Sequence, residues 1–442
     1  MTNLQARFLL PLACAAVALS GCSTQQTRAS DTTDGEAVGF AAGAGQPSSV
    51  QSSSAQSSSA QSPHARSTSN SDVRLVASAR NSRGADGFVT TRSDMGGAAV
   101  RAASLRKVSA AASVQGDYAG DPGLERFMVR MQAEGFDAAE LARLFSQVER
   151  QQWIIDYMHK TAPRPSKPSR PTGAWLRYRN KFLKESNIAA GTDFWRRHAS
   201  TLASAEKQYG VPAEYLVAII GVETRWGGYL GSHRVIDALS TLAFDYPRRS
   251  EFFTDELAHY LIIARDEQFD PLQPVGSFAG AMGLGQFMPS SFRRYAVDFD
   301  GNGHRNLWDT EDAIGSVANY FIGHGWRPGQ PVARRVSVAK AVPASLETGF
   351  PSNYRPAELT ALGIDAARLP AGQQRLSLLQ LDVGSGYEYW VGFDNFYAIT
   401  RYNHSTYYAM AVHQLAQALK ARQGGAPRTL ITEEVPASAA RG

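Results

Sequence analysis

A glutamate near the end of a strongly apolar segment is the residue best placed to do chemistry. Leu216, Ile219 and Ile220 form an apolar stripe at helical spacing, and Glu223 continues that stripe. A carboxyl group on the buried face of a helix loses solvation, which raises its pKa. Such an acid stays protonated near neutral pH and can act as a general acid. On the pattern alone, a buried Glu–Arg pair is the more common explanation, although Arg225 would point elsewhere on a helix.

A glycine-rich segment, residues 276–291, is the second unusual feature. Four glycines fall within ten residues there and keep side chains away from the wall of a groove. Gln286 both donates and accepts hydrogen bonds, which suits sugar hydroxyls and acetamides. Ser290 or Ser291 can cap a helix that begins near Phe292. No Gly-Lys-Ser/Thr follows, so the segment is not a phosphate loop, and standing alone it would be a packing turn.

A third motif follows the spacing of a calcium-binding loop. Asp298, Asp300 and Asn302 place oxygen atoms at the first, third and fifth loop positions, with glycine at the sixth. His304, at the seventh position, would contribute its backbone carbonyl. Asp309 stands at the twelfth position, where the standard loop has the longer glutamate. The pattern predicts a structural Ca²⁺ site, and a metal-free acidic turn is the alternative.

The first two motifs resemble those of one known family. GVETRWG at residues 221–227 and AGAMGLGQFMPSS at 279–291 closely resemble segments of the membrane-bound lytic murein transglycosylase B group, glycoside hydrolase family 103. GAWLRYRN at 173–180 and TRYNHS at 400–405 extend the likeness, which covers roughly residues 124–422. The resemblance implies a mainly helical α+β fold: a lysozyme-like core with an added α domain and a small β insertion.

The resemblance also implies a substrate and a set of site residues. The substrate would be peptidoglycan, with Glu223 as the sole catalytic acid and base. Asp312, rather than Asp309, would close a longer calcium loop. Several polar and aromatic residues match family positions that line the cleft, where ring faces cover sugar C–H faces and hydroxyls form hydrogen bonds. These residues are Tyr178, Gln286, Tyr320, Tyr402, Asn403 and Tyr408.

Three further residues are expected to contact substrate because of their own chemistry. Ser277 offers a hydroxyl at the start of the glycine-rich segment. Arg248 and Arg249 carry guanidinium groups that can meet the lactyl or peptide carboxylates of muropeptides. Core packing is the plain alternative for any single tyrosine of the site, and a solvated face is the alternative for the two arginines.

One carboxylate is enough if the substrate supplies the nucleophile. Glycosidases normally place two carboxylates across the bond, but the loop aspartates are committed elsewhere. Protonated Glu223 would donate to the β-1,4 oxygen between N-acetylmuramic acid and N-acetylglucosamine. The ionised group would then take the proton of the muramic C6 hydroxyl, which closes a 1,6-anhydro ring. The alternatives are a lysozyme-type muramidase that uses water and a non-catalytic peptidoglycan-binding lipoprotein.

Helices must position most of these residues. Asp137 begins a capping-box-like sequence, and Pro212 suits the first turn of the helix that carries Glu223. Residues 194–209 predict one helix, and residues 405–421 predict the last one, with Met410, Leu415 and Leu419 inward.

Extended stretches interrupt this helical pattern near the C-terminus. Residues 332–342 and 375–391 have strand-like composition, and the second stretch contains a Gly-Ser-Gly turn at 384–386. They predict a small β insertion over about 330–395 within a folded catalytic region spanning 117–424. Residues 425–442 form the predicted flexible tail.

The first residues predict export and a lipid anchor. Arg7 precedes a short apolar stretch, residues 8–19, and Leu-Ser-Gly-Cys then ends at Cys22, as in a bacterial lipobox. Residues 1–21 would be removed and Cys22 acylated. By resemblance to Gram-negative lipoproteins, Ser23 at the next position points to the periplasmic face of the outer membrane. An ordinary signal peptide is the alternative.

Composition limits the remaining possibilities. Residues 22–116 are rich in Ser, Ala, Gly and Gln, so they bury too little apolar surface for a core and predict a disordered tether. The 442 residues carry a net charge of +5, a mild balance that does not argue for nucleic acid. Two cysteines exclude a disulfide scaffold, and no apolar run is long enough for a polytopic membrane protein. No organic cofactor is expected, and other cell-wall enzymes stay open as partners.

Overall fold

The computed structural model describes residues 113–161, 170–338, 342–343, 345–365 and 369–424. The predicted signal peptide, Cys22, almost all of the predicted tether and the predicted tail lie outside these ranges. In chain order the elements are η3 (Gly116–Tyr118), α2 (Pro122–Ala133), α3 (Ala138–Phe145), α4 (Gln152–Thr161), α5 (Ala174–Arg179), α6 (Glu185–Arg197), α7 (Ala199–Tyr209), α8 (Ala213–Thr224), β1 (His233–Arg234), α9 (Val235–Asp245), η4 (Pro247–Arg249), α10 (Ser250–Asp266), β2 (Val275–Gly276), α11 (Pro289–Tyr295), α12 (Thr310–Gly323), β3 (Ala333–Val336), α13 (Pro356–Ala361), β4 (Ser377–Asp382), β5 (Tyr387–Gly392), α14 (Asp394–Tyr402) and α15 (Thr406–Gln423).

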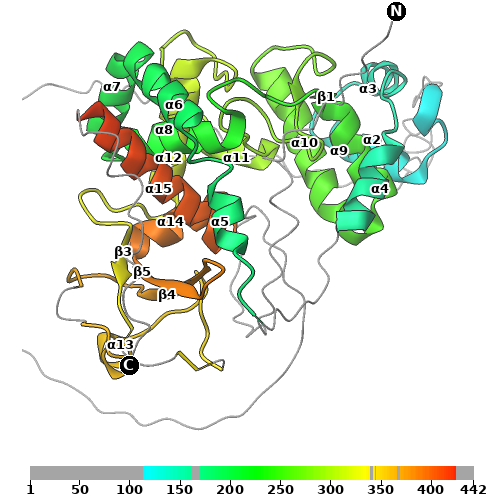
Figure 1. The fold of residues 1–442 in the computed structure, drawn as a ribbon. Helices are drawn as coiled ribbons and strands as arrows, with labels where there is room; N and C mark the ends of the chain where they lie inside the picture. The colour runs from blue at the N-terminus through cyan, green and yellow to red at the C-terminus, as the bar shows by residue number, and fades with distance from the viewer. Residues whose placement is uncertain (1–112, 162–169, 339–341, 344, 366–368, 425–442) are drawn as a thin grey trace, which may run out of the picture. The chain divides into compact units, whose positions relative to one another are not determined.

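The helix that carries Glu223 lies at the centre of the main core. α8 packs against α15, α6 and α7, and Figure 1 shows it among these helices. Every residue of α8 from Ala213 to Val222 is buried, so the helix is apolar on all sides rather than along one stripe. A helix that is apolar all round belongs in a core. Within α8 only Glu223 is less than fully buried.

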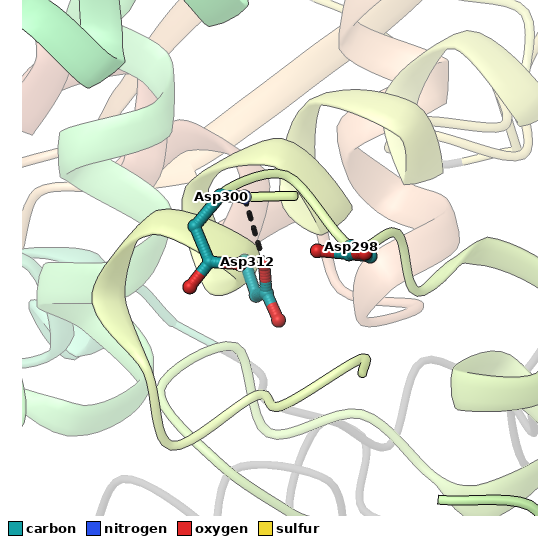
Figure 2. A group of neighbouring side chains, drawn as sticks. All are labelled: Asp298, Asp300 and Asp312. Carbon is teal, nitrogen blue, oxygen red and sulfur yellow. Dashed lines mark hydrogen bonds between the residues drawn. The ribbon is translucent and has the colours of Figure 1, made fainter. Parts of the chain in front are cut away.

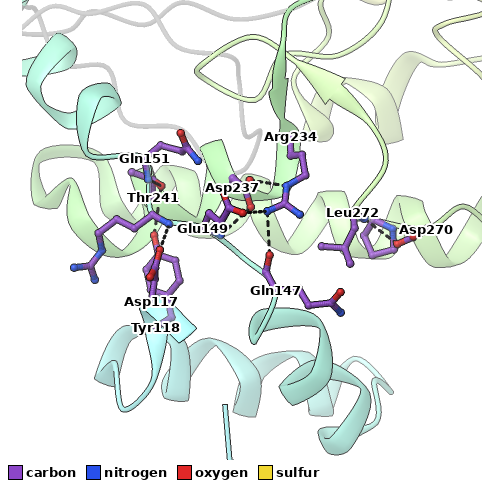
Figure 3. Close-up of polar contacts among 12 residues, drawn as sticks. Asp117, Tyr118, Gln147, Glu149, Gln151, Arg234, Asp237, Thr241, Asp270 and Leu272 are labelled. Carbon is purple, nitrogen blue, oxygen red and sulfur yellow. Dashed lines mark hydrogen bonds and ion pairs between the residues drawn. The ribbon is translucent and has the colours of Figure 1, made fainter. Parts of the chain in front are cut away.

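A second group of helices comes from the first third of the described chain together with α9 and α10. α9 packs against α2, α4 and α10. Polar contacts hold the link between α3 and α4 on α9, as Figure 3 shows: Glu149 N donates to Asp237 Oδ1 at 3.1 Å, and Gln151 N donates to Thr241 Oγ1 at 3.0 Å. Arg234 Nε lies 2.7 Å from the second oxygen of Asp237. Asp237, 3% exposed, therefore joins two segments that are far apart in sequence.

We expect Asp237→Ala to destabilise the fold by about 3 kcal/mol, because it leaves Arg234 Nε and the Glu149 N–H without their acceptor. Urea unfolding would measure this as a lower midpoint with an unchanged slope. Asp156→Ala is the matched control, since Asp156 is exposed and its carboxylate has one hydrogen-bond partner among the described residues, Gln152, one helical turn away. Equal midpoints for the two variants would contradict this account.

The expected β insertion is present as a three-stranded antiparallel sheet in the order β3-β5-β4. Ser377 of β4 pairs with Gly392 of β5, and Asp382 pairs with Tyr387, so the predicted hairpin turn at residues 384–386 is confirmed. The sheet has a small core of its own, which contains Leu359, Ile364, Leu376, Leu378, Val391 and Phe393.

Several helix boundaries differ from the sequence-based prediction. Residues 194–209 form the end of α6 and all of α7, because His198 leaves the helical conformation between them with φ −113° and ψ 28°. The sequence has no glycine or proline at this break. Pro212 is the residue before α8 rather than part of its first turn.

The prediction that Ser290 or Ser291 caps the helix after the glycine-rich segment, α11, is also wrong. α11 begins at Pro289 after Met288, and Met288 provides no side-chain cap. Ser290 instead bonds to another helix: its N–H and hydroxyl donate to the Glu256 carboxylate of α10 at 2.8 and 2.6 Å. The cap therefore comes from a residue distant in sequence. Asp137, by contrast, caps α3 as predicted.

The C-terminal helix agrees with its prediction. α15 spans Thr406–Gln423, and Met410, Leu415 and Leu419 are buried in it. Within the described ranges, no helix is both long and apolar enough to cross a membrane.

Candidate active site

Glu223 occupies the second-to-last position of α8, where the central helix leaves the core. Its side chain is only partly accessible, and the hydroxyl of Tyr408 donates to its Oε1. Burial raises the pKa of Glu223 to about 7, and the hydrogen bond from Tyr408 offsets part of that rise. No Arg or Lys forms an ion pair with Glu223 in the described part of the chain. The alternative explanation, a buried Glu–Arg ion pair, therefore does not apply to Glu223 in the described residues.

Three tyrosines from three helices surround this carboxyl group. Tyr178 comes from α5, Tyr402 from α14 and Tyr408 from α15. Burial and then the Glu223 charge raise the pKa of Tyr178 and of Tyr402, so both phenols stay neutral beside the carboxyl group. Tyr408 has the same two leading causes for its raised pKa. The Tyr178 hydroxyl is buried without a hydrogen-bond partner among the described residues, while its ring is partly exposed.

The end of α8 has a specific local structure. Arg225 and Trp226 have φ values of 52° and 57°, and Gly227 continues the left-handed run at 84°. The Trp226 ring folds back on the helix, where its Nε1 donates to Val217 O at 2.9 Å. A Cβ on Gly221 would lie 2.4 Å from that ring, so only glycine leaves room for it. This turn ends the helix at Thr224, one residue after Glu223.

Thr224 connects the end of α8 to the glycine-rich segment. Its hydroxyl donates to Leu284 O at 3.0 Å and accepts from Gly227 N at 3.2 Å. Thr224 lies inside the first motif, but its residue type and position predict no role for it. A polar residue directly after the expected acid is the only signal that the sequence offers for this link.

The glycine-rich segment runs beside the last turn of α8. Gly283 has φ 67°, and a Cβ there would lie 2.4 Å from Leu307 O, so a side chain does not fit. Gln286 has φ 52°, and its amide nitrogen donates to Gly283 O at 2.9 Å and to Leu230 O at 3.3 Å. Tyr402 donates to Gly285 O at 2.6 Å. The segment is therefore fixed on both sides and is joined to the tyrosines around Glu223.

Other predicted substrate residues have contacts of their own within the protein. Ser277 is 4% exposed and accepts N–H bonds from its own segment. Tyr320 is 3% exposed and donates to Arg401 O at 2.7 Å, so it supports Tyr402 from behind. The side chain of Asn403, directly after Tyr402, is partly exposed and has no hydrogen-bond partner in the described structure.

The two predicted arginines differ in their surroundings. Arg248 is exposed. The Arg249 guanidinium lies 4.3 and 5.0 Å from the ring centroids of Phe252 and Phe253, and burial lowers its pKa to about 10. Both arginines belong to η4, between α9 and α10.

The acidic loop gathers three carboxylates, which Figure 2 shows facing a common space. Oxygen atoms of Asp298, Asp300 and Asp312 lie within 4.8 Å of one another. Asp312 is fully buried, accepts hydrogen bonds from three backbone N–H groups and pairs with no Arg or Lys among the described residues. Carboxylate oxygens are the ligands that Ca²⁺ prefers, so these residues fit Ca²⁺.

Asp309, the alternative loop-closing residue, has a different position. It precedes α12 and accepts the N–H of Glu311 at 2.7 Å, which makes it the cap of that helix. Asn302 lies within the loop, where its Oδ1 accepts from His304 N at 2.9 Å and its amide donates to Asp300 at 2.7 Å. The structure thus places Asp312, not Asp309, with the other two acids.

Comparison with known proteins agrees with this geometry. Residues 111–417 match the family described as the transglycosylase SLT domain. The chain is also 52% identical over 307 residues to membrane-bound lytic murein transglycosylase B of Escherichia coli, covering 69% of this chain and 84% of that protein. The chain belongs to the transglycosylase SLT domain family. The resemblance inferred from the motifs is confirmed.

Solved structures of related transglycosylases share the fold. E. coli SLT35 in complex with calcium is 49% identical, with a TM-score of 0.66 over 71% of this chain and 97% of that one. SltB3 of Pseudomonas aeruginosa in complex with NAG-anhNAM-pentapeptide is 31% identical, with a TM-score of 0.57 over 67% of this chain and 78% of that one. The predicted mainly helical, lysozyme-like fold is confirmed by this likeness.

Proposed function

We propose that this chain is a lytic transglycosylase that cleaves the β-1,4 bond between N-acetylmuramic acid and N-acetylglucosamine in peptidoglycan. The observation that carries the proposal is one carboxyl group, Glu223, at the end of a buried helix and ringed by three neutral phenols. Its pKa of about 7 leaves a large protonated fraction at neutral pH. Related proteins named as lytic transglycosylases support the assignment of the substrate class.

In the first step, Glu223 acts as the general acid. Its proton passes to the glycosidic oxygen, and the bond from that oxygen to C1 of the muramic residue breaks. The acetamido group of the same sugar stabilises the positive charge that develops at C1, as in substrate-assisted glycosidases. Tyr408, which donates to Oε1, then stabilises the carboxylate that remains.

In the second step, Glu223 acts as the general base. The carboxylate takes the proton of the C6 hydroxyl, whose oxygen attacks C1 and closes the 1,6-anhydro ring. The proton count returns to its starting value, and no water is consumed. Because the nucleophile belongs to the same sugar, its high effective concentration replaces an activated water.

The test is to digest purified peptidoglycan sacculi with the full chain and analyse the soluble fragments by mass spectrometry. Transglycosylation gives 1,6-anhydromuramic ends, which are 18 Da lighter than the hydrolysis product because one water is missing. Reducing ends instead would mean a lysozyme-type muramidase. Binding to sacculi without any soluble fragments would mean a non-catalytic wall-binding protein. Either of these two outcomes would overturn the proposal.

The proposed substrate contacts differ in how much support they have. Tyr178, Tyr402 and Tyr408 have the most, because each lies close enough to Glu223 for the carboxylate charge to raise its pKa. Gln286 and Asn403 adjoin this group through Gly285 and Tyr402. Tyr320 and Ser277 would act by holding their neighbours, and Arg248 and Arg249 would meet carboxylates farther along the glycan.

Calcium is proposed as a structural ion held by the acidic loop. Carboxylates of Asp298, Asp300 and Asp312 would bind it, with Asn302 and the His304 carbonyl completing the predicted set. A related E. coli protein has been solved in complex with calcium, which supports this metal. The ion would neutralise acidic charge and stiffen the loop that follows α11; it takes no part in the proposed chemistry.

We expect Ca²⁺ to stabilise the wild-type protein by about 3 kcal/mol at a concentration 100 times its dissociation constant. Thermal unfolding with Ca²⁺ or with a chelator would show a higher Tm in calcium. Asp312→Asn should lose most of this difference, whereas Asp309→Asn should keep it, since only Asp312 lies with the other acids. Loss of the difference in Asp309→Asn alone would reverse the assignment.

The N-terminus would hold the enzyme at its substrate. We propose that Cys22 is lipidated and anchors the chain to the periplasmic face of the outer membrane. The predicted tether would link this anchor to the catalytic region. The membrane-bound relative supports membrane attachment. Metabolic labelling with a fatty acid would test it: Cys22→Ala should lose the label.

A further inference from the structure

A carboxylate in the β insertion contacts the helix that carries Tyr178. Asp382 ends β4, and its two oxygens accept hydrogen bonds from Thr172 N, Gly173 N and Ala174 N at 2.8, 2.8 and 3.3 Å. The Thr172 hydroxyl donates to the same group at 3.0 Å. Asp382 also accepts from Gly384 N at 2.9 Å, so its own turn holds the carboxylate in place.

These bonds supply a cap that α5 lacks locally. Gly173 is the residue before the helix and has no side chain to accept from the first N–H groups. α5 has only six residues, too few to be stable without external contacts. Asp382, more than two hundred residues away in sequence, takes the place of the missing N-cap.

The hairpin and the start of α5 also meet directly through their backbones. A Cβ on Gly384 would lie 3.5 Å from the Cα of Gly173, and no side chain stands between them. Burial acts to raise the pKa of Asp382, but the backbone N–H groups that it accepts outweigh burial and hold its pKa well below the usual range. The carboxylate therefore stays charged, and the cap persists at all pH values where the enzyme would work.

The far end of α5 packs on α15, the helix that carries Tyr408. Trp175 is buried with its ring centroid 5.4 Å from that of Tyr407, and Arg179 Nε donates to Gln414 Oε1 at 2.6 Å. Between them Tyr178 has a buried hydroxyl, and its ring centroid lies 6.0 Å from that of Tyr407. Tyr407 directly precedes Tyr408, the hydrogen-bond partner of Glu223, and the Glu223 charge adds to the rise that burial causes in the pKa of Tyr178. α5 thus joins the hairpin tip to one wall of the site.

We propose that Asp382 is a positioning residue: it caps α5 from the β insertion and thereby fixes Tyr178 over Glu223. The inference rests on the proposed function, because it assigns the insertion a part in that same site. Loss of the cap lets α5 shift, and water then reaches Glu223. Of the groups that face Glu223, Tyr408 and Tyr402 stay in place on α15 and α14, and only Tyr178 moves.

The test compares Asp382→Ala with Asp382→Asn, which keeps one acceptor oxygen. Glu358→Ala is the matched control, because Glu358 also caps a six-residue helix of the insertion, α13, by accepting from Arg355 N at 2.7 Å. Hydrogen exchange should become at least about tenfold faster in residues 172–182 of Asp382→Ala. The asparagine variant should lie between it and wild type, and the control should leave these residues unchanged.

Activity provides the second readout. The kcat/KM for sacculus cleavage should fall on the order of 10- to 100-fold in Asp382→Ala. The alkaline limb of the plot of kcat/KM against pH should move to lower pH, because hydration lowers the pKa of Glu223. A variant that is only less stable should keep the alkaline limb of the wild-type pH profile. We expect this result for Glu358→Ala. If Asp382→Ala does not fold, Thr172→Val removes the hydroxyl contact alone and is measured in the same way.

Unchanged hydrogen exchange in residues 172–182 of Asp382→Ala, or an alkaline limb that does not move, would overturn the inference. The proposed function would be unaffected, because the digest with the wild-type chain tests it separately. If the wild-type chain released no anhydro fragments, the proposed function would fail, and the exchange result alone would decide whether Asp382 holds α5.

Discussion

Glu223→Gln is expected to bind sacculi like the wild-type protein but to lose at least about 1,000-fold in turnover. The amide has nearly the shape of the acid, yet it can neither donate the proton to the glycosidic oxygen nor take one from the C6 hydroxyl. Acid and base roles each contribute about 100- to 10,000-fold, and both are lost together. Release of soluble fragments measures turnover, and co-sedimentation with sacculi measures binding.

Glu214→Gln is the control for that experiment. Glu214 lies on the same helix and is also buried, but it pairs with Lys420 at 2.8 Å rather than with the tyrosines of the site. We expect its turnover to stay within about twofold of wild type, because Glu214 lies in the first turn of α8 and Glu223 in the last. Near-normal cleavage by Glu223→Gln would remove Glu223 from the reaction.

Tyr408→Phe is expected to give the second largest effect. The Tyr408 hydroxyl donates to Glu223 and so favours the ionised form, which lowers the Glu223 pKa from the value that burial alone would set. Without that hydroxyl the pKa rises, and the acid stays protonated to higher pH. The alkaline limb of kcat/KM should therefore move to higher pH, while the rate at its plateau falls about 10- to 100-fold because the carboxylate formed in the first step loses its donor.

A buried tyrosine of the same helix pair separates this effect from simple loss of stability. Tyr215 donates to or accepts from His413 Nδ1 at 2.9 Å, away from Glu223. Tyr215→Phe should lower stability by about 1 kcal/mol and leave the alkaline limb in place. If Tyr408→Phe moved the limb to lower pH, the hydrogen bond would have the opposite role.

The sequence was enough to predict that burial raises the pKa of Glu223, because its position follows from the apolar residues one and two turns before it. The hairpin was equally predictable, since alternating apolar residues flank a Gly-Ser-Gly turn. Local patterns of this kind need only the periodicity of the element itself. The motifs were also specific enough to identify the family before any coordinates.

Contacts between distant residues could not be predicted in the same way. Asp382 looks like an ordinary turn residue before Gly384, and nothing near it in sequence indicates the start of α5. Ser290 looks like a helix cap, but Glu256 of another helix accepts its N–H instead. The break at His198 has no local signal either, because tertiary packing rather than a helix-breaking residue sets it.

The three phenols around Glu223 have one more consequence. Burial and the nearby carboxylate keep each of them neutral far above physiological pH. Of the four groups, the three phenols and Glu223, only Glu223 therefore changes its protonation state between acidic and mildly basic pH. An enzyme with two working carboxylates gives a bell-shaped activity curve. The proposed mechanism predicts a one-sided, sigmoid curve instead, whose single inflection would report the pKa of Glu223.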